Sequence, residues 1–133
     1  MPSTASLSGP PATSAARDLA VRAIGLPGAR AERRARRHYR LRGYRILGSN
    51  IRLAGVEVDL LCSRRGVAVF CEVKEKTGES YGDTLEMVDE RKQARLRRAA
   101  EAWLAQAPEP DLTVRFDVVA VRQGRLERLE NAF

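Results

Sequence analysis

The sequence predicts one small α/β domain, and three observations support this fold class. Its 133 residues are the length of one domain. Strand-like runs, apolar or alternating apolar with polar residues, stand between two segments of helical spacing. Apolar residues make up 44% of the chain and charged residues 31%, which is ordinary for a globular protein. The N-terminal segment is small, polar and interrupted by proline, so we expect a flexible tail over 1–16 and the domain over 17–133.

Two segments have the spacing of helices that bury one side. The first is expected over 29–42, where Gly43 ends it, and the second over 88–106. The buried positions expected in the first helix are Ala31, Ala35 and Tyr39. The core stripe expected in the second is Leu96, Ala99, Ala100, Trp103 and Leu104. The basic residues placed largely off that stripe are Lys92, Arg95, Arg97 and Arg98.

The remaining segments predict strands. Those expected are 44–47, 56–61, 67–74, 114–121 and a short one over 125–129. Gly48-Ser49-Asn50 predicts a turn after the first strand, and 63–66 a polar hairpin connection after the second. Strict alternation places Val56, Val58 and Leu60 on one face of the second strand and Glu57 and Asp59 on the other. The third strand is apolar nearly throughout, as a central strand would be.

Charge and composition limit the compartment and the partners. No apolar run is long enough to span a bilayer and no secretory signal is recognisable, so we expect a cytoplasmic protein without a membrane partner. The two cysteines, Cys62 and Cys71, fit no zinc spacing and are expected as buried thiols on strands. With 24 Lys and Arg against 17 Asp and Glu, the net charge of +7 favours a polyanionic partner. The alternative is an arginine-rich and alanine-rich proteome bias.

The first predicted helix carries most of this positive charge. Eight arginines lie between residues 30 and 45, with Glu32 as the only acid among them. Such a run indicates either a solvated helix face or a surface that binds phosphates. The candidate nucleic-acid-binding residues are Arg33, Arg36, Arg37 and Arg40.

Two acids and a lysine stand near the middle of the predicted sheet. Asp59 lies on one strand of a hairpin, and Glu72 and Lys74 share a face of its neighbour. Charged groups at such a position are costly to bury unless something compensates them. A divalent cation held by both carboxylates would do so, and Mg²⁺ or Mn²⁺ suits hard oxygen ligands. This pattern points to phosphodiester hydrolysis, with Lys74 orienting water or stabilising developing charge. The alternatives are a turn acceptor at Asp59 and a surface pair of Glu72 with Lys74.

The segments GYRILGSNIRLAGVEVDLL, VAVFCEVKEKTGESYGDTLEMVDERKQARLRRAAEAWL and VRFDVVAV resemble the bacterial YraN-like uncharacterised protein family, UPF0102. The resemblance covers about residues 29 to 133. It implies a restriction-endonuclease-like fold, with a central mixed β-sheet flanked by helices, similar to Holliday-junction resolvases. It also implies a PD-(D/E)xK-type nuclease site for DNA, including branched or damaged DNA. Resolvases of this fold act as dimers, because a junction presents two equivalent strands. The resemblance therefore also implies a homodimer.

The resemblance transfers roles to particular residues. Asp59, Glu72 and Lys74 match the catalytic motif. Asp59 and Glu72 also match its metal ligands. Glu32 on the first helix matches an acid that completes the metal site in related resolvases. Glu57 matches a family acid that would support the ligands from outside. Gln93 resembles a glutamine that some related nucleases carry on the helix after the motif lysine, although a surface glutamine is the plainer interpretation.

Two other classes of function fit the same sequence. A nuclease-like fold that binds DNA or RNA without cutting it would need only the net charge and the arginine-rich helix. An interaction protein whose helices dock a partner is the third. Few aromatic residues lie outside expected core positions, which argues against a stacking platform for single strands.

Overall fold

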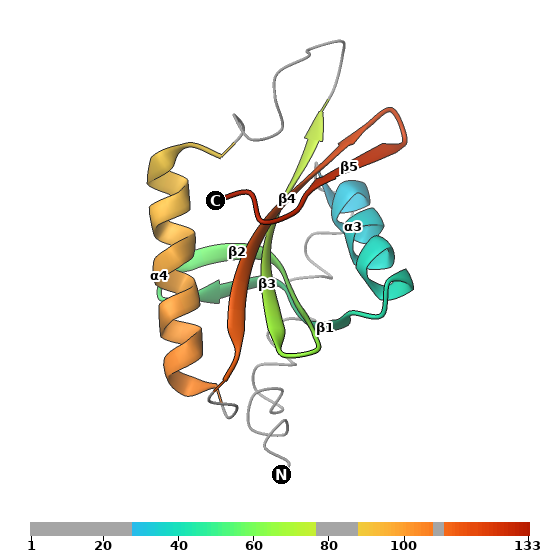
Figure 1. The fold of residues 1–133 in the computed structure, drawn as a ribbon. Helices are drawn as coiled ribbons and strands as arrows, with labels where there is room; N and C mark the ends of the chain where they lie inside the picture. Colours follow the sequence, from blue (N-terminus) through green and yellow to red (C-terminus); the bar gives the residue numbers. More distant parts are fainter. Residues whose placement is uncertain (1–27, 77–87, 108–110) are drawn as a thin grey trace.

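Five strands form one mixed sheet, and one helix packs on each of its faces (Figure 1). The computed structural model describes residues 28–76, 88–107 and 111–133. The elements are α3 (Ala29–Leu41), β1 (Arg45–Leu53), β2 (Val56–Arg64), β3 (Val67–Lys76), α4 (Glu90–Gln106), β4 (Thr113–Arg122) and β5 (Arg125–Leu129). Strands lie side by side in chain order, antiparallel except for the parallel pair β3–β4. The predicted α/β fold with a central mixed sheet flanked by helices is confirmed. The expected tail over 1–16 and the domain start at 17 lie outside the described residues.

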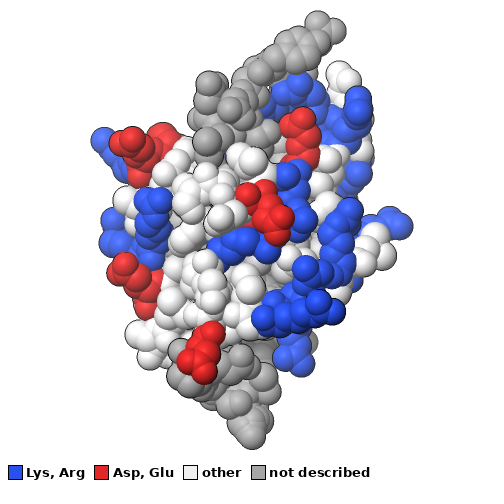
Figure 2. Space-filling model, in the orientation of Figure 1, with Lys and Arg blue, Asp and Glu red and all other residues white. Residues whose placement is uncertain are grey.

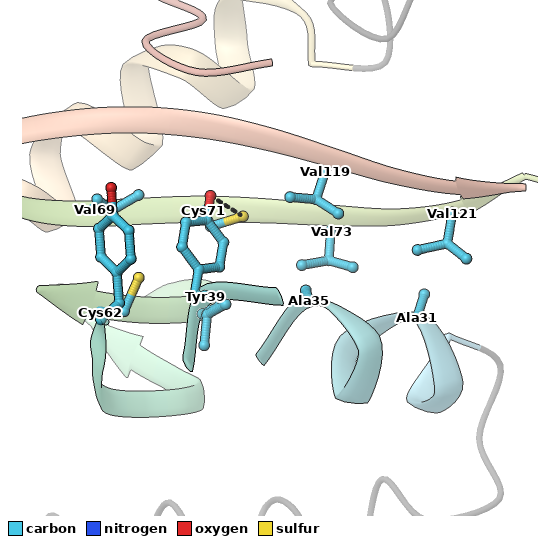
Figure 3. Close-up of a cluster of buried hydrophobic side chains, with 11 residues drawn as sticks. Ala31, Ala35, Tyr39, Cys62, Val69, Cys71, Val73, Val119 and Val121 are labelled. Atoms are coloured by element: carbon cyan, nitrogen blue, oxygen red, sulfur yellow. Dashed lines mark hydrogen bonds between the residues drawn. The ribbon is translucent and has the colours of Figure 1, made fainter. Parts of the chain in front are cut away.

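Each helix buries one stripe against the sheet. Helix α3 buries the three predicted positions against a core that includes both cysteines, which are free and buried as expected (Figure 3). Helix α4 buries Leu96, Ala99, Ala100 and Trp103. Leu104 is 36% exposed, so its predicted core position is wrong. It lies about 100° around the helix from Trp103, beyond the edge of the stripe. Neither helix in the described ranges is both long and apolar enough to cross a membrane.

Strand β1 continues through the segment that was expected to be a turn. The predicted strand over 44–47 with a turn at Gly48-Ser49-Asn50 is therefore wrong, because the residues of that turn lie inside a longer strand. These turn-forming residues produce a bend within the strand instead. The pairing register shifts between Ile46 and Gly48, and Asn50 adopts a φ of 53°. A side chain at Gly48 would begin 2.9 Å from the Ile51 side chain, which explains the glycine.

This bend changes the face that β2 presents. Val58 packs in the core under α4, whereas Leu60 packs in the core under α3. The prediction that Val56, Val58 and Leu60 share one face is therefore wrong. Val58 and Leu60 pair with the two neighbours of Asn50, whose left-handed backbone interrupts the alternation of side chains. As a result, apolar residues near the hairpin tip pack in the core under α4, whereas those nearer its base are divided between the two cores.

The other strands were predicted within a few residues. The connection expected over 63–66 is a tight turn whose central residues, Arg65 and Gly66, have φ of 50° and 78°. These positive values at both positions suit a two-residue hairpin turn. Strand β3 contacts both β2 and β4 and is buried along most of its length, as a central strand should be.

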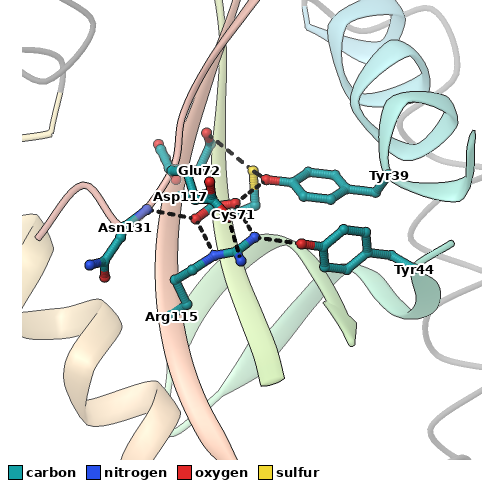
Figure 4. Close-up of polar contacts among 8 residues, drawn as sticks. Tyr39, Tyr44, Cys71, Glu72, Arg115, Asp117 and Asn131 are labelled. Atoms are coloured by element: carbon teal, nitrogen blue, oxygen red, sulfur yellow. Dashed lines mark hydrogen bonds and ion pairs between the residues drawn. The ribbon is translucent and has the colours of Figure 1, made fainter. Parts of the chain in front are cut away.

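A buried carboxylate joins α3, β4 and the segment after β5 (Figure 4). Asp117 on β4 is fully buried. Its Oδ2 accepts a hydrogen bond from the Tyr39 hydroxyl at 2.6 Å, and its Oδ1 accepts one from the Asn131 amide at 3.0 Å. Arg115 donates to both oxygens at 2.9 Å and also pairs with Glu130 at 2.7 Å. Every lone-pair direction of this acid is thus matched by a donor of the chain.

Candidate active site

The two predicted acids meet where β2 and β3 part. The two strands pair from Arg64 opposite Val67 to Leu60 opposite Cys71, and the next residues are Asp59 and Glu72. Here the Val73 amide donates to Asp59 Oδ2 at 2.9 Å. The aspartate side chain therefore accepts the hydrogen bond in place of a backbone carbonyl of the partner strand. The Asp59 carboxyl is also hydrogen-bonded to Glu72. The hairpin therefore brings the two carboxyl groups into direct contact.

Burial and mutual repulsion dominate the electrostatics of this acid pair. Glu72 is 2% exposed. Burial, and then the charge of Glu72, raise the pKa of Asp59 to about 8, although the Val73 amide favours the ionised form. At neutral pH without a cation, this raised pKa favours the protonated form of the Asp59 carboxyl. A cation held by both carboxylates would favour the ionised form of Asp59.

Two lysines from different elements approach Glu72. Lys74 Nζ on β3 lies 3.3 Å from Glu72 Oε2, so the predicted proximity of this pair is present. Lys92 Nζ on α4 donates to the same oxygen. Burial alone lowers the pKa of Lys92, but the hydrogen bond and charge of Glu72 outweigh it, so that this pKa is raised. Both lysine side chains are partly exposed.

Lys92 is the site residue that the sequence interpretation missed. It was placed largely off the buried stripe of α4, and the structure corrects this. Lys92 precedes the buried Leu96 by one helical turn, in line with Ala99 and Trp103. The spacing of a basic residue at the head of an apolar stripe was the available signal. It was obscured by the neighbouring arginines, which gave the whole helix the character of a solvated basic surface.

Glu32 extends the acidic group from the α3 side. Its Oε2 is buried and has no hydrogen-bond partner within the described part of the chain, whereas the side chain is hydrogen-bonded to Asn50. Burial raises the pKa of Glu32, and the charges of Glu57 and Glu72 add to this rise. A buried oxygen without a donor is rare in folded proteins and calls for a ligand, an ion or a water. The acid that the family resemblance selected thus stands at this site.

These residues line a pocket of about 490 Å³. Its walls are Gly28, Glu32, Asn50, Arg52, Gly55, Val56, Glu57, Asp59, Glu72, Val73, Lys74, Lys92, Arg95 and Leu96. Glu57 belongs to the lining, as expected of a supporting acid, and is exposed. Gln93 does not line the pocket, because its side-chain amide donates to the Val88 carbonyl at 3.0 Å. The glutamine therefore secures the start of α4 and does not contact the acids.

The predicted arginine face lies beside this pocket and does not line it. Figure 2 shows Lys and Arg side chains gathered on the side of the molecule where α3 lies. Arg33, Arg37 and Arg40 are exposed there. Arg36 is half-buried and donates to Ser49 Oγ at 3.0 Å, so part of its role is to tie α3 to β1. The basic residues that line the pocket come from β1, β3 and α4.

The donor set fits a hard divalent cation. Within 28–76, 88–107 and 111–133, no group of three or more His, Cys, Asp or Glu side chains is already arranged to hold a metal. Mg²⁺ needs fewer protein ligands, since it keeps several waters and uses one or two carboxylates. Asp59 and Glu72 supply two carboxylates in contact, and the unpaired Glu32 oxygen offers a third acceptor. Carboxylates without nearby thiol or imidazole favour Mg²⁺ or Mn²⁺ over softer metals.

Comparison with known proteins places the chain in a family. The model of the uncharacterised protein family UPF0102 matches residues 31–121. A UPF0102 protein of Parafrankia sp. is 42% identical over 104 residues, which cover 74% of this chain and 88% of the relative. That of Frankia alni is 41% identical over 120 residues, 86% of this chain and 100% of the relative. That of Shewanella amazonensis is 39% identical over 107 residues, 80% and 98%. The chain therefore belongs to the UPF0102 family.

Proposed function

We propose that this protein is a metal-dependent endonuclease that hydrolyses phosphodiester bonds in DNA, including branched or damaged DNA. The observation that carries the proposal is the contact between Asp59 and Glu72 in a pocket that also holds Lys74 and an unpaired oxygen of Glu32. Perturbed acids that converge in a pocket are typical of functional sites. The net charge of +7 supports a polyanionic substrate.

Each residue of the site has a role in this reaction. Asp59 and Glu72 would hold Mg²⁺ or Mn²⁺, and Glu32 would offer a further oxygen from α3. The ion supplies Lewis-acid chemistry, which polarises the phosphoryl group and makes water a better nucleophile. Lys74 places a fixed positive charge where negative charge develops on the phosphoryl oxygens. The water oxygen bonds to phosphorus, one bridging P–O bond breaks, and the leaving sugar oxygen takes up a proton.

Cleavage of labelled DNA in Mg²⁺ or Mn²⁺ tests the proposal. Linear duplexes and four-way junctions should be compared for the wild type, Asp59→Asn and Glu72→Gln. We expect wild-type cleavage and a loss of more than roughly 100-fold in both variants, because even partners of metal ligands contribute 10–100-fold. Glu101→Gln is the matched control, since it removes one exposed carboxylate from α4 outside the pocket.

The same experiment separates cleavage from binding alone. Equal activity in all four proteins would indicate a contaminant and overturn the proposal. DNA binding with a steep salt dependence but no cleavage in either metal would instead support a non-catalytic nucleic-acid-binding module. Thermal melts of the variants establish that a loss of activity is not a loss of folding.

A further inference from the structure

The pocket holds more positive charge beside Glu72 than one carboxylate needs. Lys92 and Lys74 both approach Oε2 of this single side chain. The two lysines come from different elements, since Lys74 lies on β3 and Lys92 on α4. Neither lysine approaches the other carboxyl group within ion-pair distance, so both ammonium groups converge on one oxygen of the acid pair.

The local structure of α4 fixes the position of Lys92. Asp89 caps the helix, and its Oδ1 accepts the Lys92 amide at 2.8 Å. The Gln93 amide donates to the Asp89 carbonyl at 2.9 Å, and its side chain holds the Val88 carbonyl at 3.0 Å. The buried side chains of Val88 and Leu96 anchor this turn on the sheet. The capped and anchored turn therefore directs Lys92 into the pocket.

The pocket walls carry equal numbers of acidic and basic side chains. Among the described residues the acids are Glu32, Glu57, Asp59 and Glu72, and the bases are Arg52, Lys74, Lys92 and Arg95. Four formal negative charges thus face four positive ones. A divalent ion held by the acids would leave an excess of two positive charges. Each phosphodiester carries one negative charge, so this excess matches two backbone phosphates.

We propose that Lys92 holds a non-bridging phosphate oxygen of the nucleic-acid backbone in the pocket, and that Arg95 holds a neighbouring phosphate. This inference rests on the proposed nuclease function and assigns its substrate contacts to α4. Arg95 follows Lys92 by three residues, a spacing that places two side chains next to each other on a helix. It is exposed and lines the pocket. The Lys92 ammonium would leave Glu72 if the acids held a cation, and would then be free to bind the phosphate.

The assignment differs from the prediction based on the arginine run of α3. That run is dense, but its residues lie outside the pocket lining. Lys92 and Arg95 stand at the edge of the pocket that contains the acids. Contacts with the backbone phosphates in the pocket therefore include α4 beside Lys74, and the α3 surface contributes attraction over a longer range.

DNA affinity of charge-matched variants tests the proposal. A fluorescent duplex is titrated in Ca²⁺, which takes the same oxygen ligands. We expect Lys92→Met to weaken binding at least roughly tenfold, because hydrogen bonds to charged groups are among the stronger ones. Arg91→Met removes the same charge from the same turn outside the pocket, and should weaken binding less than roughly threefold. Arg95→Met and Arg98→Met form a second pair with the same expected order.

A second readout separates phosphate binding from positioning of Glu72. Mn²⁺ titration calorimetry without DNA should show that Lys92→Met binds the ion as tightly as the wild type or more tightly, since Lys92 competes for Glu72. Weaker Mn²⁺ binding would make Lys92 a support for the metal ligand and overturn the proposal. Lys92→Arg should restore most of the DNA affinity.

The outcomes distinguish this proposal from the nuclease function. Equal losses of DNA affinity in Lys92→Met and Arg91→Met, with wild-type cleavage that Asp59→Asn abolishes, would overturn only the α4 assignment. A wild-type protein that neither binds nor cleaves DNA would overturn both.

Discussion

Two buried acidic groups lie on opposite faces of the same sheet, and they are compensated differently. Asp117 faces α3, and its two oxygens accept four hydrogen bonds from protein donors. Glu72 lies toward α4 and contacts two lysines that are partly exposed. Its neighbour Asp59 is hydrogen-bonded to it, and Glu32 keeps one buried oxygen without a donor among the described residues.

The difference separates a structural acid from a functional one. A buried carboxylate stabilises a fold only when the chain itself provides its donors and counter-charge. Asp117 has both, so nothing from outside the chain is needed. The group around Glu72 has three acids in close proximity and an incomplete set of donors, which is an arrangement that a bound cation completes. Burial alone would not have distinguished them, since Asp117 and Glu72 are both almost inaccessible to solvent.

Removal of the Asp117 charge should give the largest effect on stability. Asp117→Asn leaves Arg115, which is 15% exposed, without its main counter-charge. We expect the free energy of unfolding to fall by about 3 kcal/mol, as is typical when one partner of a buried pair is removed. Urea denaturation followed by circular dichroism measures it. Glu130→Gln removes the exposed partner of the same arginine and should cost under about 1 kcal/mol. Similar losses of unfolding free energy in the two variants would contradict the structural role of Asp117.

Asp59→Asn should remove a loss of stability that the metal-free wild type shows as the pH rises. Because the pKa of Asp59 is raised to about 8 from an ordinary value of 3.8, the folded wild type binds more protons than the unfolded chain between these values. Its free energy of unfolding therefore falls as the pH rises through this range and levels off above it. We expect the variant to lack roughly 1–2 kcal/mol of this decline between about pH 5 and pH 8. Denaturation in a chelator at several pH values gives both curves, and parallel curves would contradict the prediction.

Glu32→Gln should have a smaller effect, which is confined to the affinity for the metal. The amide keeps a hydrogen-bonding oxygen for Asn50 but loses the charge that faces the pocket. We expect Mn²⁺ affinity to fall roughly tenfold, the scale of a partner that supports metal ligands. The stability of the metal-free protein should change by less than about 0.5 kcal/mol. In the same calorimetric titration, Glu101→Gln is the control at an exposed position outside the pocket. An unchanged affinity in Glu32→Gln would exclude Glu32 from the metal site.

Much of the fold follows from local patterns. Helix α3 and strands β3, β4 and β5 were predicted within about two residues, because their periodicity is regular and turn residues bound them. The errors concentrate at Asn50. Its left-handed backbone converts an apparent turn into a bend and moves Val58 and Leu60 to different cores. Nothing local distinguishes a bend inside a strand from a turn between strands, since both use Gly, Ser and Asn.

The site was predictable to the extent that one hairpin builds it. Asp59, Glu72 and Lys74 lie on adjacent strands, so a period of two and a short turn are enough to bring them together. Glu32 required the family resemblance, because its approach depends on how α3 packs. Lys92 was missed, since the position of α4 is set by tertiary contacts between distant segments. Residue patterns thus identified Asp59 and Glu72 and left out Lys92, which comes from α4.

Strand β3 serves both acidic groups at once, and this constrains its alignment. Cys71 points toward the side of Asp117, and the next residue, Glu72, points into the pocket. A slip of one residue would reverse the two, sending a carboxylate among the tyrosines and a thiol among the lysines. The tight turn at Arg65 and Gly66 on one side and ten paired positions with β4 on the other prevent such a slip. Insertions or deletions within this strand are therefore expected to destroy the packing and the pocket together.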